Sequence, residues 1–134
     1  MKTMPVLGWT AEDVFLVSDR AYSLFQQGRY REAALLFDGL VAVDPGNSYC
    51  VNALAACHYM LGEPQQTVAV LSRFLDAHPN DVEAHSRRCE AFLQLGRTNE
   101  ARQDLEFLNK QGAGSYARRL RLLFDNLRSG MLPA

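Results

Sequence analysis

The sequence predicts an all-α fold in which pairs of antiparallel helices repeat along the chain. Gly28, Gly62 and Gly96 are spaced at 34-residue intervals, and a fixed period of this length indicates a helical repeat array. Apolar and small residues keep the same register, as expected if the repeats pack through equivalent positions. The recurring sets are Phe37, Leu71 and Leu105, then Leu40, Phe74 and Leu108, then Ala33, Thr67 and Ala101, and finally Ala21, Ala55 and Cys89.

Length and composition fit one folded domain over residues 1–134. The chain has 134 residues, 48% of them apolar, and a formal net charge of −1. This excludes a disordered chain and argues against a nucleic-acid partner, which would favour a basic surface. No apolar run approaches the ~18 residues of a membrane span, and the N-terminus makes a poor signal peptide. We therefore expect a cytoplasmic protein without membrane insertion.

The first helix is predicted to begin near Ala11. Thr10 and Asp13 are spaced as a capping box, in which each side chain bonds the other residue's backbone N–H. Trp9, which follows Val6 and Leu7, suggests a hydrophobic plug on this helix, with a partner-binding N-terminal arm as the alternative.

Each repeat is predicted to contain two helices joined at its glycine, which can take the left-handed conformation just past a helix end. In the second repeat the helices are expected at about Ser48–Leu61 and Pro64–Ala77; proline is tolerated near the first helical position. Asp44-Pro45-Gly46-Asn47 and His78-Pro79-Asn80-Asp81 then supply turns whose last residue suits the next N-cap. The three repeats are expected at residues 14–47, 48–81 and 82–115.

A capping helix is predicted at about residues 116–129, with Ser115 as its N-cap. Its apolar residues are spaced for one helical face: Tyr116, Leu120, Leu123, Phe124 and Leu127. Its basic residues give either a solvated outer face or a docking patch for an acidic partner: Arg118, Arg119, Arg121 and Arg128.

The repeats resemble tetratricopeptide repeats. The 34-residue helix pair carries a G-x-Y-x-x-A pattern at Gly28, Tyr30 and Ala33, and Asp44-Pro45 closes the unit. The resemblance implies a right-handed superhelix of three repeats in which the first helix of each pair lines a concave face. The family's early tryptophan is replaced by Val17, Val51 and His85.

The resemblance implies a peptide-binding groove along the first helices of the repeats. Its aromatic surface suits an extended peptide with apolar anchors, and Asn52 could pair with peptide backbone. The alternative for each aromatic is ordinary core packing between helices. The predicted peptide-binding residues are Phe15, Ser18, Tyr22, Phe25, Tyr49, Asn52, Ala56, Tyr59 and Glu90; Glu83, Ser86 and Leu93 complete the face in the third repeat.

One subclass of these repeats binds chaperone C-termini through a lysine and asparagine clamp, which this sequence does not match. Ser18 and Tyr22 stand at the clamp positions of the first repeat, and Ala53 replaces the asparagine of the second. Glu83 replaces the lysine of the third repeat, where Arg87 does match.

A further resemblance is to the class II chaperones of bacterial type III secretion. It is carried by LFQQGRYREAALLFDGLVAVDP, by Ala56-Cys57, by CEAFLQLG and by the closing SYARRLRLLFDNL. It implies a virulence-associated cytoplasmic chaperone or adaptor that holds a secreted translocator or effector segment before export, with a homodimer left open. The alternatives are a generic assembly scaffold, a docking subunit of a larger complex, or an enzyme or regulatory subunit that the repeats only dock.

No catalytic, cofactor or metal site is expected. The sequence lacks nucleophile-elbow, phosphate-loop, zinc-protease and dinucleotide motifs. The cysteines Cys50, Cys57 and Cys89 form no CxxC pair, and we expect reduced thiols that serve as small core residues. The sequence therefore predicts a non-enzymatic binding protein.

Overall fold

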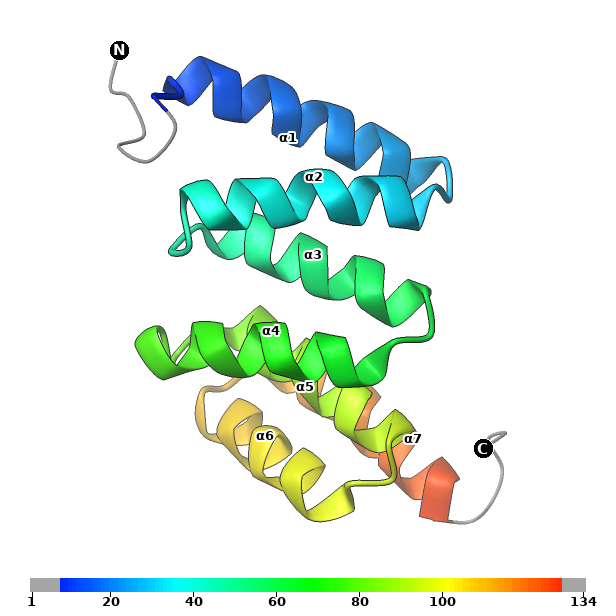
Figure 1. The fold of residues 1–134 in the computed structure, drawn as a ribbon. Coiled ribbons are helices and arrows are strands. Elements are labelled where there is room, and N and C mark those ends of the chain that lie inside the picture. Colours follow the sequence, from blue (N-terminus) through cyan, green and yellow to red (C-terminus); the bar gives the residue numbers. More distant parts are fainter. Residues whose placement is uncertain (1–7, 129–134) are drawn as a thin grey trace. The chain divides into compact units, whose positions relative to one another are not determined.

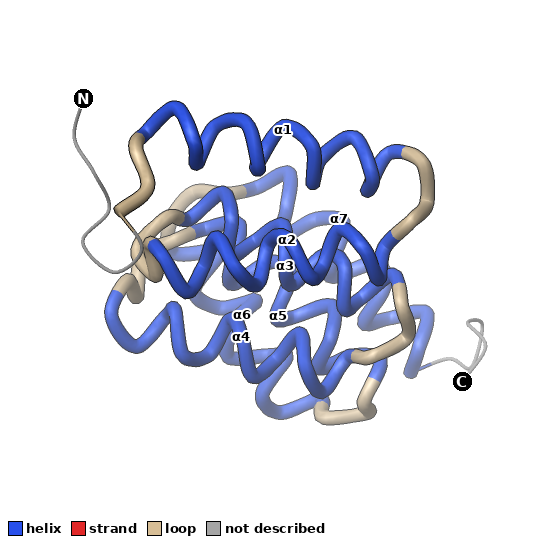
Figure 2. Tube along the Cα trace, turned by 45° about the horizontal axis from the view of Figure 1, so that its top comes forward, coloured by secondary structure: helices blue, strands red, loops and turns tan. Residues whose placement is uncertain are grey.

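The computed structural model describes residues 8–128, with side chains up to residue 125. Over this part the chain forms seven α-helices and no strand, which confirms the all-α prediction of three helix pairs and a capping helix (Figures 1 and 2). The helices are α1 (Ala11–Gln26), α2 (Tyr30–Val43), α3 (Ser48–Met60), α4 (Pro64–Ala77), α5 (Val82–Gln94), α6 (Thr98–Lys110) and α7 (Gly114–Arg128).

The three repeated glycines end helices as predicted. Their φ angles are +77° at Gly28, +73° at Gly62 and +73° at Gly96, in the left-handed region that glycine enters without steric cost. At each turn the N–H of the residue after the glycine donates to a carbonyl five residues earlier, at 3.0, 2.8 and 2.9 Å. This is the long bond of a Schellman C-cap, and it satisfies a carbonyl that the helix end leaves open.

A fourth helix in the described part, α6, also ends at a left-handed glycine, Gly112 (φ +71°). Sequence reasoning missed it because it departs from the 34-residue spacing. Because the turn at Gly112 ends α6, α7 begins at Gly114 and not at the predicted residue 116. Ser115 therefore lies inside the first turn of α7. The predicted N-cap at Ser115 is therefore wrong.

The other predicted caps are confirmed. Thr10 Oγ1 accepts from the Asp13 N–H at 3.1 Å, and Asp13 Oδ2 accepts from the Thr10 N–H at 2.8 Å, which forms the capping box. Asn47 caps α3 and Asp81 caps α5 through their side chains. Trp9 is half-buried, whereas Val6 and Leu7 lie outside the described residues.

The chain divides into two compact units, Met1–Glu63 with α1 to α3 and Pro64–Ala134 with α4 to α7. The single domain over residues 1–134 stays a prediction.

In unit 1, α2 packs against both α1 and α3. Ala21 of α1 and Ala33 of α2 are fully buried, as expected where two helices approach closely. Phe37 of α2 is also fully buried and meets the ring of Tyr49 edge-on, with centroids 6.1 Å apart. Phe37 therefore packs between the helices of the first two repeats.

In unit 2, α5 packs against α4, α6 and α7. Cys89 and Ala101 mark the close approach of α5 and α6, since the Cys89 thiol donates to the Ala101 carbonyl at 3.3 Å. The last helix caps this unit: Leu120 is fully buried in the core cluster, and Leu123 and Phe124 pack against it. The cluster consists of Cys89, Phe92, Leu93, Ala101, Leu108, Ala117 and Leu120; the side chains of Leu127 and Arg128 lie outside the described part.

Candidate peptide-binding face

Unit 1 leaves three large aromatic side chains exposed. Phe15 and Tyr22 of α1 are 66% and 47% exposed, and Tyr49 in the first turn of α3 is 49% exposed. Phe15 and Tyr22 are two helical turns apart, so they project from the same side of α1. Single exposed apolar residues are ordinary, but several that share one face indicate an interaction surface. We call Phe15, Ser18, Tyr22 and Tyr49 the aromatic face.

The structure brings α1 and α3 together at Tyr49. The hydroxyl groups of Ser18 and Tyr49 are hydrogen-bonded. Partial burial raises the pKa of Tyr49, the bond to Ser18 opposes this, and the nearby Tyr22 and Asp19 raise it further. Because its ring also rests on Phe37, Tyr49 is held in place while half of it stays open to solvent.

Two predicted groove aromatics, Phe25 and Tyr59, are half-buried. Phe25 meets the ring of Tyr30 edge-on, with centroids 5.1 Å apart. Tyr59 is also partly covered. The core-packing alternative therefore describes Phe25 well.

The expected exposure of Asn52 and Ala56 is wrong, since they are only 2% and 7% exposed. Asn52 Nδ2 donates to the Ser48 carbonyl at 3.0 Å and to the Ser48 hydroxyl at 3.3 Å. The physical reason is that the middle of α3 is covered on all sides, since no position from Cys50 to Cys57 is exposed. The Asn52 side chain is thus buried, and its amide donates within α3.

The equivalent face of α5 in unit 2 is largely occupied. Ser86 is 2% exposed, and Leu93 is buried in the cluster that contains Leu120 of α7. Glu90 forms an ion pair with Arg119 of α7, and Glu83 pairs with Arg87 at 3.0 Å. The predicted binding residue Glu90 is therefore engaged within the unit.

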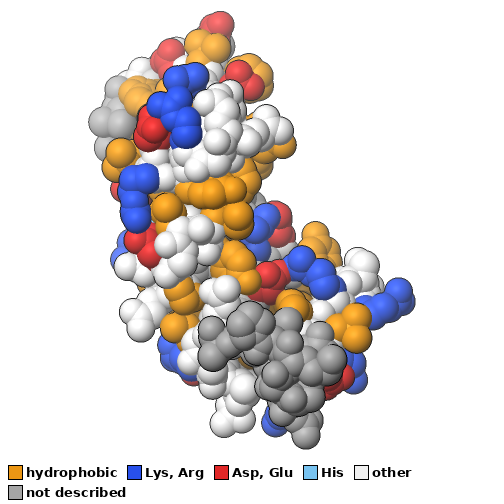
Figure 3. Space-filling model, turned by 90° about the vertical axis from the view of Figure 1, so that its right-hand side faces the viewer, with side chains coloured by type: hydrophobic (Ala, Val, Ile, Leu, Met, Phe, Trp, Pro, Cys, Tyr) orange, Lys and Arg blue, Asp and Glu red, His pale blue; other side chains and the backbone are white. Residues whose placement is uncertain are grey.

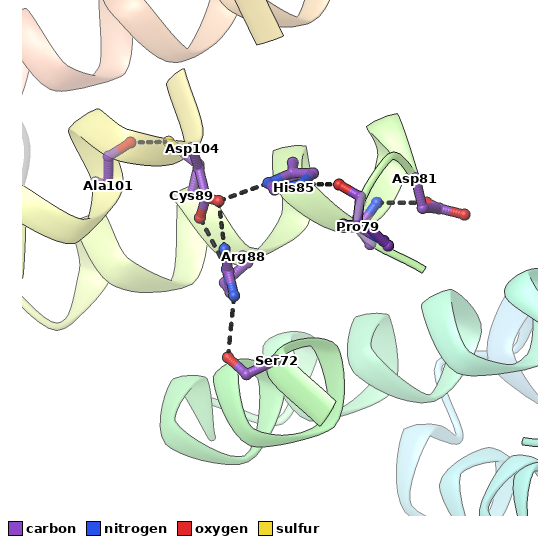
Figure 4. Close-up of polar contacts among 9 residues, drawn as sticks. Ser72, Pro79, Asp81, His85, Arg88, Cys89, Ala101 and Asp104 are labelled. Carbon is purple, nitrogen blue, oxygen red and sulfur yellow. Dashed lines mark hydrogen bonds and ion pairs between the residues drawn. The ribbon is translucent and has the colours of Figure 1, made fainter. Parts of the chain in front are cut away.

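A buried polar cluster in unit 2 was not anticipated (Figure 4). His85 Nδ1 lies 2.7 Å from Asp104 Oδ1, and His85 Nε2 lies 2.8 Å from the Pro79 carbonyl oxygen. Arg88 donates to both oxygens of Asp104, at 3.0 and 2.7 Å, and to the Ser72 hydroxyl at 3.3 Å. Asp104 is 1% exposed, so its charge is compensated where water cannot reach it.

The sequence carries a signal for this cluster. Asp104 lies three residues after the buried Ala101 and four before the buried Leu108, so it falls on the inner face of α6. A carboxylate in that position needs a buried partner. His85 and Arg88 on α5 provide one, and the cluster ties α4, α5 and α6 together.

The cysteines are buried thiols. Burial raises the pKa of Cys50 and of Cys57 to about 11, and burial with the Asp104 charge raises that of Cys89 to about 12. Thiols held this far above neutral pH stay protonated and unreactive. Among residues 8–128 no group of three or more His, Cys, Asp or Glu side chains is placed to hold a metal ion. The helices of the same part are all too short or too polar to cross a membrane.

The helix pairs, their glycine turns and the capping helix define a tetratricopeptide-repeat fold, and residues 24–86 match the family described as "Tetratricopeptide repeat". The fold is similar to that of PcrH from Pseudomonas aeruginosa in complex with the chaperone binding region of PopB. That comparison has a TM-score of 0.79 and 20% identity, and covers 87% of this chain and 98% of PcrH.

The Yersinia enterocolitica type III secretion translocator chaperone SycD has a similar fold as well, with a TM-score of 0.78 and 21% identity over 93% of this chain and 98% of SycD. A curated relative, DnaJ homolog subfamily C member 3 of Bos taurus, is 28% identical over 92 residues. These residues are 66% of this chain but only 18% of the relative. At these identities the solved structures establish the fold alone.

Proposed function

We propose that the protein is a non-enzymatic chaperone of bacterial type III secretion, which holds an apolar segment of a secreted translocator or effector in the cytoplasm before export. The observation that carries the proposal is the exposed aromatic face of unit 1. Two observations about relatives support it: PcrH was solved with the chaperone binding region of PopB, and SycD is a translocator chaperone. A homodimer stays a prediction.

The aromatic face has the physical properties of a peptide anchor site. Phe15, Tyr22 and Tyr49 supply large apolar area with few rotatable bonds, so ordering them on binding costs little entropy. Tyr49 is already fixed by Phe37 and Ser18. A cargo segment that covers the three rings would hide apolar surface on both partners, which is what a secreted protein needs before export.

The test compares three tagged forms of the full chain in the native host: the wild type, Phe15→Ala/Tyr22→Ala, and Leu35→Ala as a matched control. Leu35 is 69% exposed on α2, so the control also removes an exposed apolar side chain. We expect the wild type and the control to retain the same secreted protein, and the double variant to retain at least tenfold less of it.

Equal retention by all three forms would contradict the proposed site. If Arg118→Glu/Arg121→Glu on α7 lost the partner instead, the protein would be a docking subunit for an acidic partner. The melting temperature of Phe15→Ala/Tyr22→Ala should equal that of the wild type, because both side chains are exposed. Loss of the partner then reports a lost contact and not a lost fold.

A further inference from the structure

We propose that the segment held by unit 1 is basic as well as apolar, with lysine or arginine residues between its apolar anchors. This inference rests on the proposed function and names the chemistry of its cargo. The aromatic face is bordered by the carboxylates of Glu12 and Asp19, which form no ion pair with any residue that the structure describes.

Carboxylates and aromatics alternate along one ridge of α1. Glu12, Phe15, Asp19 and Tyr22 follow one another at steps of three, four and three residues. Residues three and four apart are neighbours on a helix surface, so the four side chains form a continuous row. All four are exposed. We call them the mixed ridge.

Asp19 of the mixed ridge interacts electrostatically with Tyr49 of α3. The Asp19 charge acts on the Tyr49 hydroxyl, as the Tyr22 side chain also does. Asp19 therefore lies within electrostatic reach of the Tyr49 hydroxyl on α3, and on α1 it is a neighbour of Phe15 and Tyr22. A cation bound along the ridge would be attracted by a carboxylate and by the neighbouring aromatic rings together.

The basic residues elsewhere in unit 1 are mostly paired already. Arg29 pairs with Glu32, and Arg31 pairs with Glu63 at 2.9 Å; basic and acidic side chains adjoin near the α1–α2 turn in Figure 3. Within the described part of the chain neither Glu12 nor Asp19 forms an ion pair.

Arg20 follows Asp19 directly, and one residue corresponds to a rotation of about 100° around the helix. Arg20 therefore does not point along the mixed ridge. Residues 8–63 contain seven acidic and three basic residues, so the surroundings of the ridge also favour a basic partner. The exposed Arg118 and Arg121 of unit 2 would repel a basic segment. We therefore assign the binding of the basic segment to unit 1.

The test uses three twelve-residue peptides that share three leucines at fixed positions and carry four lysines, four glutamines or four glutamates elsewhere. Dissociation constants are measured by fluorescence anisotropy for the wild type, for Glu12→Gln/Asp19→Asn, and for Asp38→Asn/Glu106→Gln. The last pair removes two exposed carboxylates from α2 and α6, so it is matched in net charge.

We expect the wild type to bind the lysine peptide about fivefold or more tightly than the glutamine peptide, because each exposed ion pair strengthens binding by up to about fivefold. The glutamate peptide should bind most weakly of the three. Glu12→Gln/Asp19→Asn should reduce the preference to within about twofold, whereas the control should keep it. Added salt should weaken the preference.

Equal binding of the lysine and glutamine peptides to the wild type would overturn the inference and leave the proposed apolar site standing. Equal loss of preference in both variants would also overturn it, because net charge alone would then explain the effect. If none of the three peptides binds, the proposed function falls together with the inference.

Discussion

The two units present different surfaces although they are built from the same repeat. In unit 1 the first helices leave Tyr22 and Tyr49 exposed. In unit 2, Glu83 stands 34 residues after Tyr49 and pairs with Arg87. Leu93 stands 34 residues after Tyr59 and is buried with Leu120. The 34-residue period therefore sets where a helix lies, while the residue present and its neighbours decide whether its side chain is exposed.

The units also differ in where their charges pair. Unit 1 pairs arginines with glutamates at the surface, where the pairs contribute little stability. Unit 2 encloses the His85, Arg88 and Asp104 cluster. We therefore expect unit 2 to be sensitive to the loss of a charge and unit 1 to tolerate it, which the following substitutions test.

The largest effect is expected for Asp104→Ala. It leaves His85 and Arg88 without their buried counter-charge, which typically costs about 3–5 kcal/mol of unfolding free energy. Glu106→Gln, two residues further on the exposed side of α6, is the matched control and should change stability by less than about 0.5 kcal/mol. Urea unfolding measures both, and a loss below about 1 kcal/mol for Asp104→Ala would show that the cluster is not needed.

Leu120→Ala should come next. Leu120 is fully buried between α7 and the core of unit 2, and such truncations cost about 2–5 kcal/mol. Leu122, which is 60% exposed on the same helix, provides the control, because Leu122→Ala should be nearly neutral. If the two variants unfold at the same urea concentration, α7 does not cap the unit.

Two glycines of unit 1 should respond in opposite directions. Gly28→Ala places a Cβ on a residue with φ +77°, which should cost about 1–2 kcal/mol. Gly39 lies inside α2 with open space where a Cβ would stand, so Gly39→Ala should stabilise by up to about 1 kcal/mol. Thermal melts of both proteins give the signs, and a stabilising Gly28→Ala would refute the left-handed turn.

The smallest effect concerns pH in unit 1. Hydrogen bonds from Arg31 and from His58 lower the pKa of Glu63. A carboxyl whose pKa is lowered by folding stabilises the protein above its ordinary value of ~4.3 and loses that contribution as the pH falls through its folded-state value. Melting temperatures from pH 6 to 3 should therefore fall slightly more steeply for the wild type than for Glu63→Gln. Parallel curves would contradict this.

Local sequence rules predicted most of the fold. The glycine turns, the Thr10–Asp13 capping box and the bounds of α4 each depend on a few neighbouring residues, and such rules act before tertiary packing. The start of α7 was missed because Gly112 provides a turn outside the repeat register.

The candidate site was less predictable because exposure depends on residues distant in sequence. Periodicity placed Asn52 and Tyr49 on one face, yet Asn52 is buried and Tyr49 is half-exposed. The inner position of Asp104 was visible in the spacing of α6, but its partners His85 and Arg88 could be assigned only once α5 and α6 were seen together.

The most direct test of binding at the aromatic face of unit 1 is the affinity of the lysine-bearing leucine peptide for Tyr22→Ala, measured together with the melting temperature. Tyr116, which is 39% exposed at the start of α7, gives the matched control Tyr116→Ala in unit 2. We expect Tyr22→Ala to melt like the wild type and to bind about tenfold or more weakly, since an anchor aromatic contributes about 2 kcal/mol. Tyr116→Ala should bind as the wild type does. Wild-type affinity in Tyr22→Ala, with the loss appearing in Tyr116→Ala instead, would contradict the assignment of binding to unit 1.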